Sequence, residues 1–156
     1  MDEPPWAVCL EDAVQWVAKA YPEEGCGLIL SGPDGYRFLA TENLANRYHA
    51  LDPETYPRTA RTFYIINPIE FMRAEDRGER VAVVVHSHAD VGDYFSDEDV
   101  AGALMPAFDD DPAEPSHPGT DYLVVSVRES GPDRASLFAF DPDHPRSFAL
   151  VWQTAL

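Results

Sequence analysis

Apolar and polar residues alternate in patterns that divide the first quarter of the chain into a helix and two strands. Between Val8 and Tyr21 apolar side chains recur every three or four residues, which predicts a helix with one buried face that ends before Pro22. Two apolar runs at 27–30 and 36–41 flank a Ser-Gly-Pro-Asp-Gly turn, and this arrangement predicts a β-hairpin.

The middle of the chain is less regular. Residues 43–62 are polar and contain two prolines, so we expect a surface loop there, followed by a short strand at 63–66. A helix is expected over 67–77, because Pro68 suits the first helical position and Gly78 suits the residue after the helix.

The second half begins with an apolar run, 81–85, which is typical of a strand buried on both faces. A helix is predicted over 96–104, with Ser96 as its N-cap and acidic residues in its first turn. Residues 106–120 are rich in proline and acidic residues and predict a loop. Three further strands are expected at 122–127, 135–140 and 148–152.

This order of elements predicts an α/β (α+β) fold, in which helices flank a single mixed β-sheet. A length of 156 residues fits one domain with one core, so we treat 1–156 as a single domain.

Charge narrows the classes of partner. The chain has 11 Lys and Arg against 28 Asp and Glu, a net charge of −17, which disfavours binding to nucleic acid or to an anionic membrane. The same charge could favour a basic partner or serve only solubility. The N-terminus does not resemble a signal peptide, and no apolar run is long enough to span a membrane, so we expect a cytoplasmic protein. In that compartment Cys9 and Cys26 are expected to be free thiols and not a disulfide.

His86 and His88 follow the buried run and are the first candidates for chemistry. Side chains at i and i+2 on a strand point to the same face, so the two imidazoles could bind one metal ion. A carboxylate from the first turn of the next helix would complete a three-ligand zinc site with a fourth position for water. Spacing alone does not separate Asp99 from Asp97 for that role.

A family resemblance selects among these acids. The segment His-Ser-His, seven residues, Ser, two residues, Asp, at 86–99, resembles the signature of the JAMM (MPN+, JAB, Mov34) zinc metalloproteases. The upstream segment Pro-Glu-Glu-Gly-Cys-Gly, at 22–27, is similar to the family's Pro-x-Glu-x-Cys-Gly sequence and selects Glu24 over Glu23. The chain therefore resembles a compact prokaryotic member of this family, with a cytidine-deaminase-like MPN/JAB domain.

The resemblance implies specific roles. His86, His88 and Asp99 would bind Zn²⁺, Glu24 would act as general base and then acid on the zinc-activated water, and Ser96 would stabilise the oxyanion. Ser87 is expected to be structural. Four more residues are not expected to take part in catalysis. Cys26 is expected to be a buried thiol, and His49, His117 and His144 are expected to be exposed to solvent outside the site.

The implied activity is hydrolysis of an amide bond at the C-terminal tail of a ubiquitin-like or sulfur-carrier protein. Strand addition at a sheet edge near 63–66 could receive such a tail. Two alternatives stay open: a non-catalytic scaffold of the same fold, and a zinc amidase that acts on a small conjugate on a carrier protein.

Overall fold

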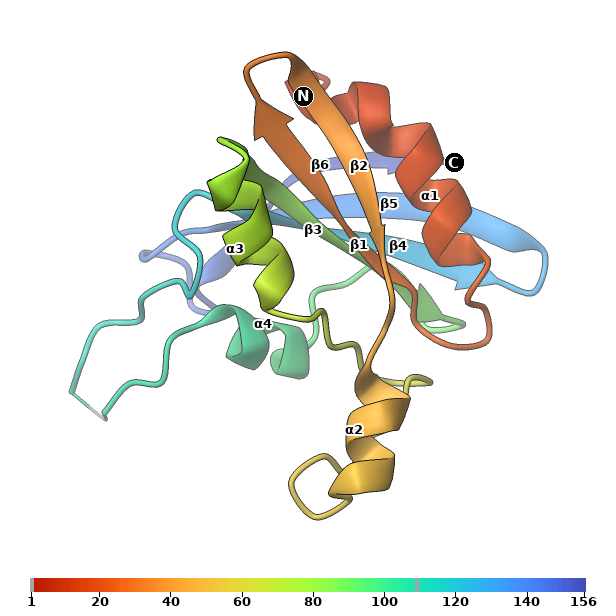
Figure 1. The fold of residues 1–156 in the computed structure, drawn as a ribbon, viewed down its shortest axis with the longest axis vertical. Helices are drawn as coiled ribbons and strands as arrows, with labels where there is room; N and C mark the ends of the chain where they lie inside the picture. Colours follow the sequence, from red (N-terminus) through yellow and green to blue (C-terminus); the bar gives the residue numbers. More distant parts are fainter. Residues whose placement is uncertain (1, 109) are drawn as a thin grey trace.

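A six-stranded mixed β-sheet forms the centre of the molecule (Figure 1). The computed structural model describes residues 2–108 and 110–156. In the sheet the strands follow the order β2-β1-β3-β4-β5-β6. Only β3 and β4 are parallel, and the other neighbours are antiparallel. The strands are β1 (Cys26–Gly32), β2 (Gly35–Thr41), β3 (Arg80–Ala89), β4 (Asp121–Arg128), β5 (Gly131–Phe140) and β6 (Phe148–Ala155).

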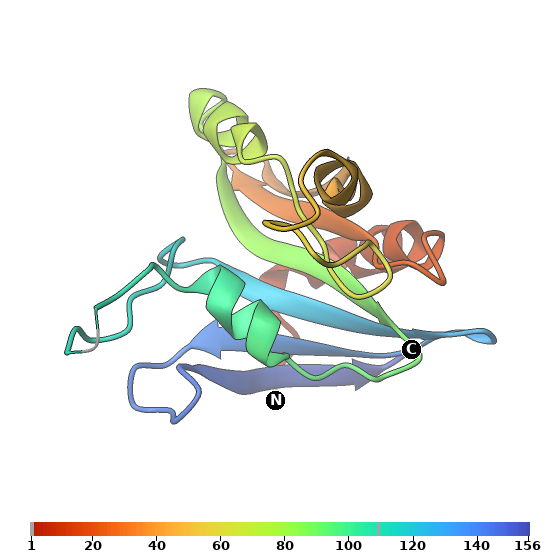
Figure 2. The ribbon, with the colours of Figure 1, turned by 90° about the horizontal axis from the view of Figure 1, so that it is seen from below.

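Helices cover both faces of this sheet (Figures 1 and 2). The 3₁₀-helix η1 (Pro5–Cys9) and α1 (Leu10–Ala18) pack on one face through a core that includes Trp6 and Val17. On the other face, α3 (Ile69–Asp76) and α4 (Asp97–Ala103) pack around Phe95. The expected α+β fold with one mixed sheet is therefore confirmed.

The register of β1 and β3 positions the site. These two strands are antiparallel, and Cys26 at the start of β1 pairs with His86 near the end of β3. Residues just before β1 consequently lie beside the last residues of β3, although about 60 positions separate them in the sequence.

Most predicted elements are present with shifted ends. The hairpin, the helix at 67–77, the buried strand at 81–85 and the three C-terminal strands are confirmed. The first helix is shorter than the expected 8–21, because α1 spans only Leu10–Ala18 and η1 precedes it. Gly78 has a φ of 74°, the left-handed conformation expected after a helix.

Two predictions for the middle of the chain are wrong. The expected loop at 43–62 contains a helix, α2 (Ala45–Leu51), which lies beyond the end of the sheet at the bottom of Figure 1. Residues 63–66 form no strand. Both edges of β1 already pair with β2 and β3, and the backbone of 63–66 bonds instead to the Asn43 side chain and to the Leu44 N–H.

The acidic segment at 106–120 is largely irregular where it is described, with an isolated bridge between Leu104 and Pro115; residue 109 lies outside the described residues. Within 2–108 and 110–156, no helix has the length and apolar character needed to cross a membrane.

Candidate metal centre

The two histidines of the motif lie at the end of β3 and face the same side of the sheet. β3 continues to Ala89, so His86 and His88 are part of the strand and not residues that follow it. Their Nε2 atoms are 3.2 Å apart, and both side chains are almost fully buried. The i, i+2 spacing therefore brings the imidazoles together as the sequence predicts.

Asp99 reaches both imidazoles from the first turn of α4. Its Oδ1 lies 3.2 Å from His86 Nε2, and its Oδ2 lies 3.2 Å from His88 Nε2. A capping box holds the carboxylate there: Ser96 Oγ accepts from the Asp99 backbone N–H, and Asp99 Oδ2 accepts from the Ser96 N–H. Asp97, the competing acid, points away and pairs with Arg146 at 2.9 Å.

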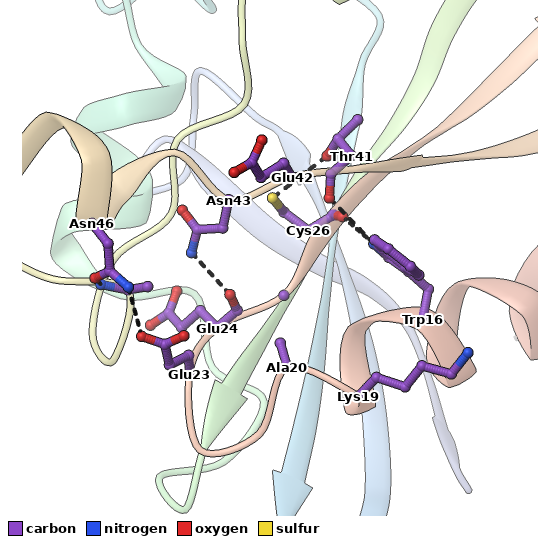
Figure 3. A pocket seen from close by; sticks show the side chains of 12 residues that line it. Trp16, Lys19, Ala20, Glu23, Glu24, Cys26, Thr41, Glu42, Asn43 and Asn46 are labelled. Atoms are coloured by element: carbon purple, nitrogen blue, oxygen red, sulfur yellow. Dashed lines mark hydrogen bonds between the residues drawn. The ribbon is translucent and has the colours of Figure 1, made fainter.

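Glu24 approaches the same point from the segment before β1. One ligand atom each from Glu24, His86 and His88 lies within 4.8 Å of the others, and all three residues are buried. This group could hold a metal ion. Glu23, the neighbouring acid, instead accepts a hydrogen bond from Asn46 at 2.8 Å (Figure 3).

Ser87 and Gly25 bring the Glu24 segment against β3. The hydroxyl of Ser87 lies on the opposite face from the histidines and accepts from the Gly25 N–H at 2.8 Å, while Gly25 O accepts from the Ser87 N–H at 3.0 Å. A Cβ at Gly25 would lie 2.7 Å from backbone atoms of Val17 in α1, so only glycine fits between helix and strand. The Pro-x-Glu-x-Cys-Gly segment thus carries a packing requirement as well as Glu24.

Two asparagines fix the other side of Glu24. The side-chain amide of Asn43 donates to the backbone carbonyls of Glu24 and Phe63 at 2.8 and 2.9 Å, and its oxygen accepts from the N–H groups of Ala45 and Ile65. Figure 3 shows both asparagines on the same side of this segment, with Asn43 next to Glu24 and Asn46 next to Glu23. Neither asparagine can be predicted from the sequence, because their partners are far away in the chain and no local pattern marks them.

A cleft of about 120 Å³ lies beside the histidines and has two different walls. His88, Ser96 and Asp99 line one side, and β3 and the capped start of α4 supply them. We call this side, together with the fully buried His86 next to it, the strand wall. The opposite side, residues 58–63, is the loop wall, and it contributes Arg58, Arg61, Thr62 and Phe63. Glu24 lies between the two walls.

The two carboxylates have opposite electrostatic environments. Burial raises the pKa of Glu24 to about 8, an effect that His88 partly offsets and Asp99 reinforces. Burial alone would raise the pKa of Asp99 as well, but the charge of His86 and hydrogen bonds from both histidines hold it well below its usual value. Asp99 therefore stays anionic, whereas Glu24 can gain or lose a proton near neutral pH.

The donor set fits a tetrahedral metal ion. Ligands about 2.1 Å from Zn²⁺ in tetrahedral geometry are about 3.4 Å from one another. The two Nε2 atoms are 3.2 Å apart, and each lies 3.2 Å from a different carboxylate oxygen of Asp99, so these separations are close to that value. Glu24 also lies within ligand distance of the two histidines, and the role of Asp99 as a ligand stays a prediction.

The aromatic, cysteine and remaining histidine side chains match their predictions to different degrees. Tyr64 stacks on His86, with ring centroids 4.2 Å apart, and no sequence signal indicated it. Cys26 is a free, fully buried thiol, and Cys9 is free and buried as well. His117 is exposed as predicted and stacks on Phe71. His49 and His144, expected to be exposed, are half-buried, and His49 Nδ1 bonds to the Tyr56 carbonyl.

Comparisons with known proteins agree with this architecture. A structure of a protein from Salinibacter ruber is similar, with a TM-score of 0.54 and 26% identity over 97% of this chain and 88% of that one. A protein from Desulfitobacterium hafniense shares the fold, with a TM-score of 0.54 and 18% identity over 91% of this chain and 84% of that one. Comparison with curated protein sequences gives no match.

The model of a family described as prokaryotic homologs of the JAB domain matches residues 7–139. That range contains all of β1 to β4 and every residue of the cleft. The chain therefore belongs to the family of prokaryotic JAB-domain homologs.

Proposed function

We propose that the protein is a zinc-dependent peptidase or isopeptidase that hydrolyses an amide bond at the C-terminal tail of a ubiquitin-like or sulfur-carrier protein. The observation that carries this proposal is the convergence of two imidazoles and two carboxylates at one buried site. Such clusters are costly to bury, and a metal ion offsets the cost of the negative charge.

In this proposal His86, His88 and Asp99 bind the metal. The persistently anionic Asp99 suits a ligand, and the backbone N–H of Ser96 donates to its Oδ2 and helps to orient the carboxylate. His88 Nδ1 lies 3.0 Å from the Gly92 carbonyl, which orients its Nε2 toward the cleft.

Bound zinc would polarise the scissile carbonyl and acidify the attacking water. Glu24 would accept a proton from that water and return it to the leaving amine. A pKa near neutrality suits both steps, because the carboxylate must be a base first and an acid second. Catalysis by the carboxylate needs it near the metal but free of it, which the position of Glu24 between the walls allows.

Ser96 would stabilise the oxyanion. Its oxygen already accepts from the Asp99 N–H, so the hydroxyl proton remains free to donate into the cleft that Ser96 lines. A donor placed where negative charge develops lowers the barrier without costly reorganisation.

The shape of the cleft supports a tail substrate. The volume of about 120 Å³ between the two walls suits an extended Gly-Gly segment, which has no side chains to accommodate. The strand-addition site that the sequence placed near 63–66 is wrong, because no strand forms there.

The test is cleavage of a ubiquitin-like protein fused through its Gly-Gly tail to a reporter. Zinc-loaded wild-type protein should release the reporter, and the Glu24→Gln variant should be at least about 100-fold slower while still binding zinc. Equal rates for the two proteins, or less than about a tenth of an equivalent of bound zinc after reconstitution, would favour the scaffold alternative.

A further inference from the structure

The loop wall places two arginines in the cleft of a strongly acidic protein. The whole chain has 11 Lys and Arg against 28 Asp and Glu, yet Arg58 and Arg61 both line the cleft of about 120 Å³. Apart from them, the charged residues that line this cleft are Glu24, Glu98 and Asp99. Arginine thus makes up a larger share of the charged side chains in this cleft than Lys and Arg do in the whole chain.

Internal partners do not saturate these guanidinium groups. Arg58 Nη1 lies 3.3 Å from Glu98 Oε1, but this buried nitrogen has no hydrogen-bond partner of acceptable geometry among the described residues. Arg61 is exposed and forms no ion pair with any residue in 2–108 or 110–156. A guanidinium carries five N–H donors, so both side chains keep donors for a ligand.

The backbone between the two arginines is fixed relative to Glu24. Ala60 is buried; its N–H donates to Asn46 Oδ1 at 2.8 Å, and its carbonyl accepts from the Glu24 N–H at 2.7 Å. The arginines consequently project from a segment that is already ordered against the catalytic region. Binding through them would cost little additional ordering of the backbone.

We propose that Arg58 and Arg61 bind a carboxylate that the substrate carries next to the scissile amide. The inference rests on the proposed function and adds a substrate class to it. Planar guanidinium groups match a carboxylate with paired hydrogen bonds, and a peptide offers two sources of that group. One is the α-carboxylate of a one-residue leaving group, and the other is an acidic side chain next to the cleaved bond.

The experiment measures binding without turnover. Zinc-loaded Glu24→Gln protein is titrated calorimetrically with Gly-Gly-Ala and its C-terminal amide, and then with Gly-Gly-Asp-Ala-amide and Gly-Gly-Asn-Ala-amide. We expect the acid to bind about 10- to 100-fold more tightly than its neutral match in one pair, and that pair identifies the source of the carboxylate.

Charge-matched variants separate the arginines from the metal, because zinc itself attracts a carboxylate. Arg58→Gln and Arg61→Gln, each added to Glu24→Gln, should reduce the preference for the acidic peptide over its neutral match to about 3-fold or less. Arg47→Gln is the control: it removes the same charge from exposed α2, where Arg47 pairs with Glu42 and does not line the cleft. It should keep the preference.

Equal binding within both peptide pairs would overturn the proposal, and so would a preference that survives in both arginine variants. The outcome for the proposed function is separate. If the wild-type protein cleaves Gly-Gly amides but shows no preference for a carboxylate, only the carboxylate site is contradicted. If the protein prefers carboxylates but hydrolyses no amide, the proposed function is contradicted and the carboxylate site is supported.

Discussion

The two walls of the cleft are built by different means. The strand wall uses regular structure: alternation along β3 aims His86 and His88, and a capping box at the start of α4 aims Asp99. The loop wall has no strand or helix, and the side chains of Asn43 and Asn46 hold it in place. Local rules thus position the proposed metal ligands, whereas a few long-range hydrogen bonds position the side that faces them.

The largest expected effect separates Asp99 from Glu24, the two acids within reach of the histidines. Asp99→Asn and Glu24→Gln should each lower kcat by about 100- to 10,000-fold. Only Asp99→Asn should abolish stabilisation by zinc, which in wild type should be about 2.7 kcal/mol at a free zinc concentration 100-fold above Kd, or roughly 5 to 10 °C in Tm.

Melting curves with and without zinc check this difference, with EDTA reversing the shift. If Glu24→Gln removes the zinc stabilisation and Asp99→Asn keeps it, the two acids exchange roles and the metal lies closer to Glu24 than we propose.

The next effect concerns Ser96, which is both a helix cap and a proposed oxyanion donor in the strand wall. Ser96→Gly removes the hydroxyl, but glycine at an N-cap lowers the free energy of unfolding by only about a few tenths of a kcal/mol. We therefore expect kcat to fall about 100- to 1000-fold with nearly unchanged Tm. Steady-state kinetics and thermal melts measured on one preparation check both. A proportional loss of Tm and activity would show that the role is only structural.

A third effect follows from the position of Glu24 between the walls. Its pKa in the folded protein, about 8, is above the ordinary value of 4.5, so the folded state retains a proton that the unfolded state releases. In zinc-free protein the stability that this group contributes should be fully present below about pH 4.5 and should fall as the pH rises to about 8, by up to about 5 kcal/mol.

Glu24→Gln mimics the protonated form and should lack this loss. Urea denaturation of both proteins between pH 5 and 9, with chelator present, measures the difference. The free energy of unfolding of the variant should rise relative to that of wild type as the pH increases to about 8. A constant difference between the two proteins across the range would contradict the raised pKa.

The smallest effect tests the loop wall. Asn43→Ala removes four hydrogen bonds, and because the site is only partly buried, water can replace some of them. We expect a loss of about 2 kcal/mol in the free energy of unfolding, together with a lower kcat. Asn67→Ala, which removes one exposed hydrogen bond at the start of α3, is the matched control and should change neither by much. An unchanged kcat in Asn43→Ala would mean that the loop wall takes no part in catalysis.

The same contrast explains what the sequence could predict. The spacing of His86 and His88 on an apolar strand and the Ser-x-x-Asp pattern at 96–99 are local signals, and the structure brings these side chains together. The capping box also gives a physical reason for Asp99 over Asp97, a choice that had depended on the family resemblance. Their roles in catalysis remain predictions.

The loop wall could not be predicted in this way. The Asn43 side chain bonds to Glu24, Phe63 and Ile65, which lie about 20 residues away in the sequence. Hydrophobic periodicity gives no signal for such contacts. The apolar residues at 63–66 predict a strand, but the neighbouring β1 has no free edge. Helix α2 was missed because its seven residues have little apolar periodicity.

The paired hydrogen bonds between Ser87 and Gly25 have a consequence for how the protein opens. Since Ser87 lies between the two histidines in β3, the Glu24 segment cannot detach without disturbing the strand that carries them. The two should behave as one cooperative unit in local unfolding, and the Gly25 and Ser87 amides should exchange with deuterium at similar slow rates. A fluctuation that separates Glu24 from the histidines is then nearly as rare as disruption of the central sheet itself.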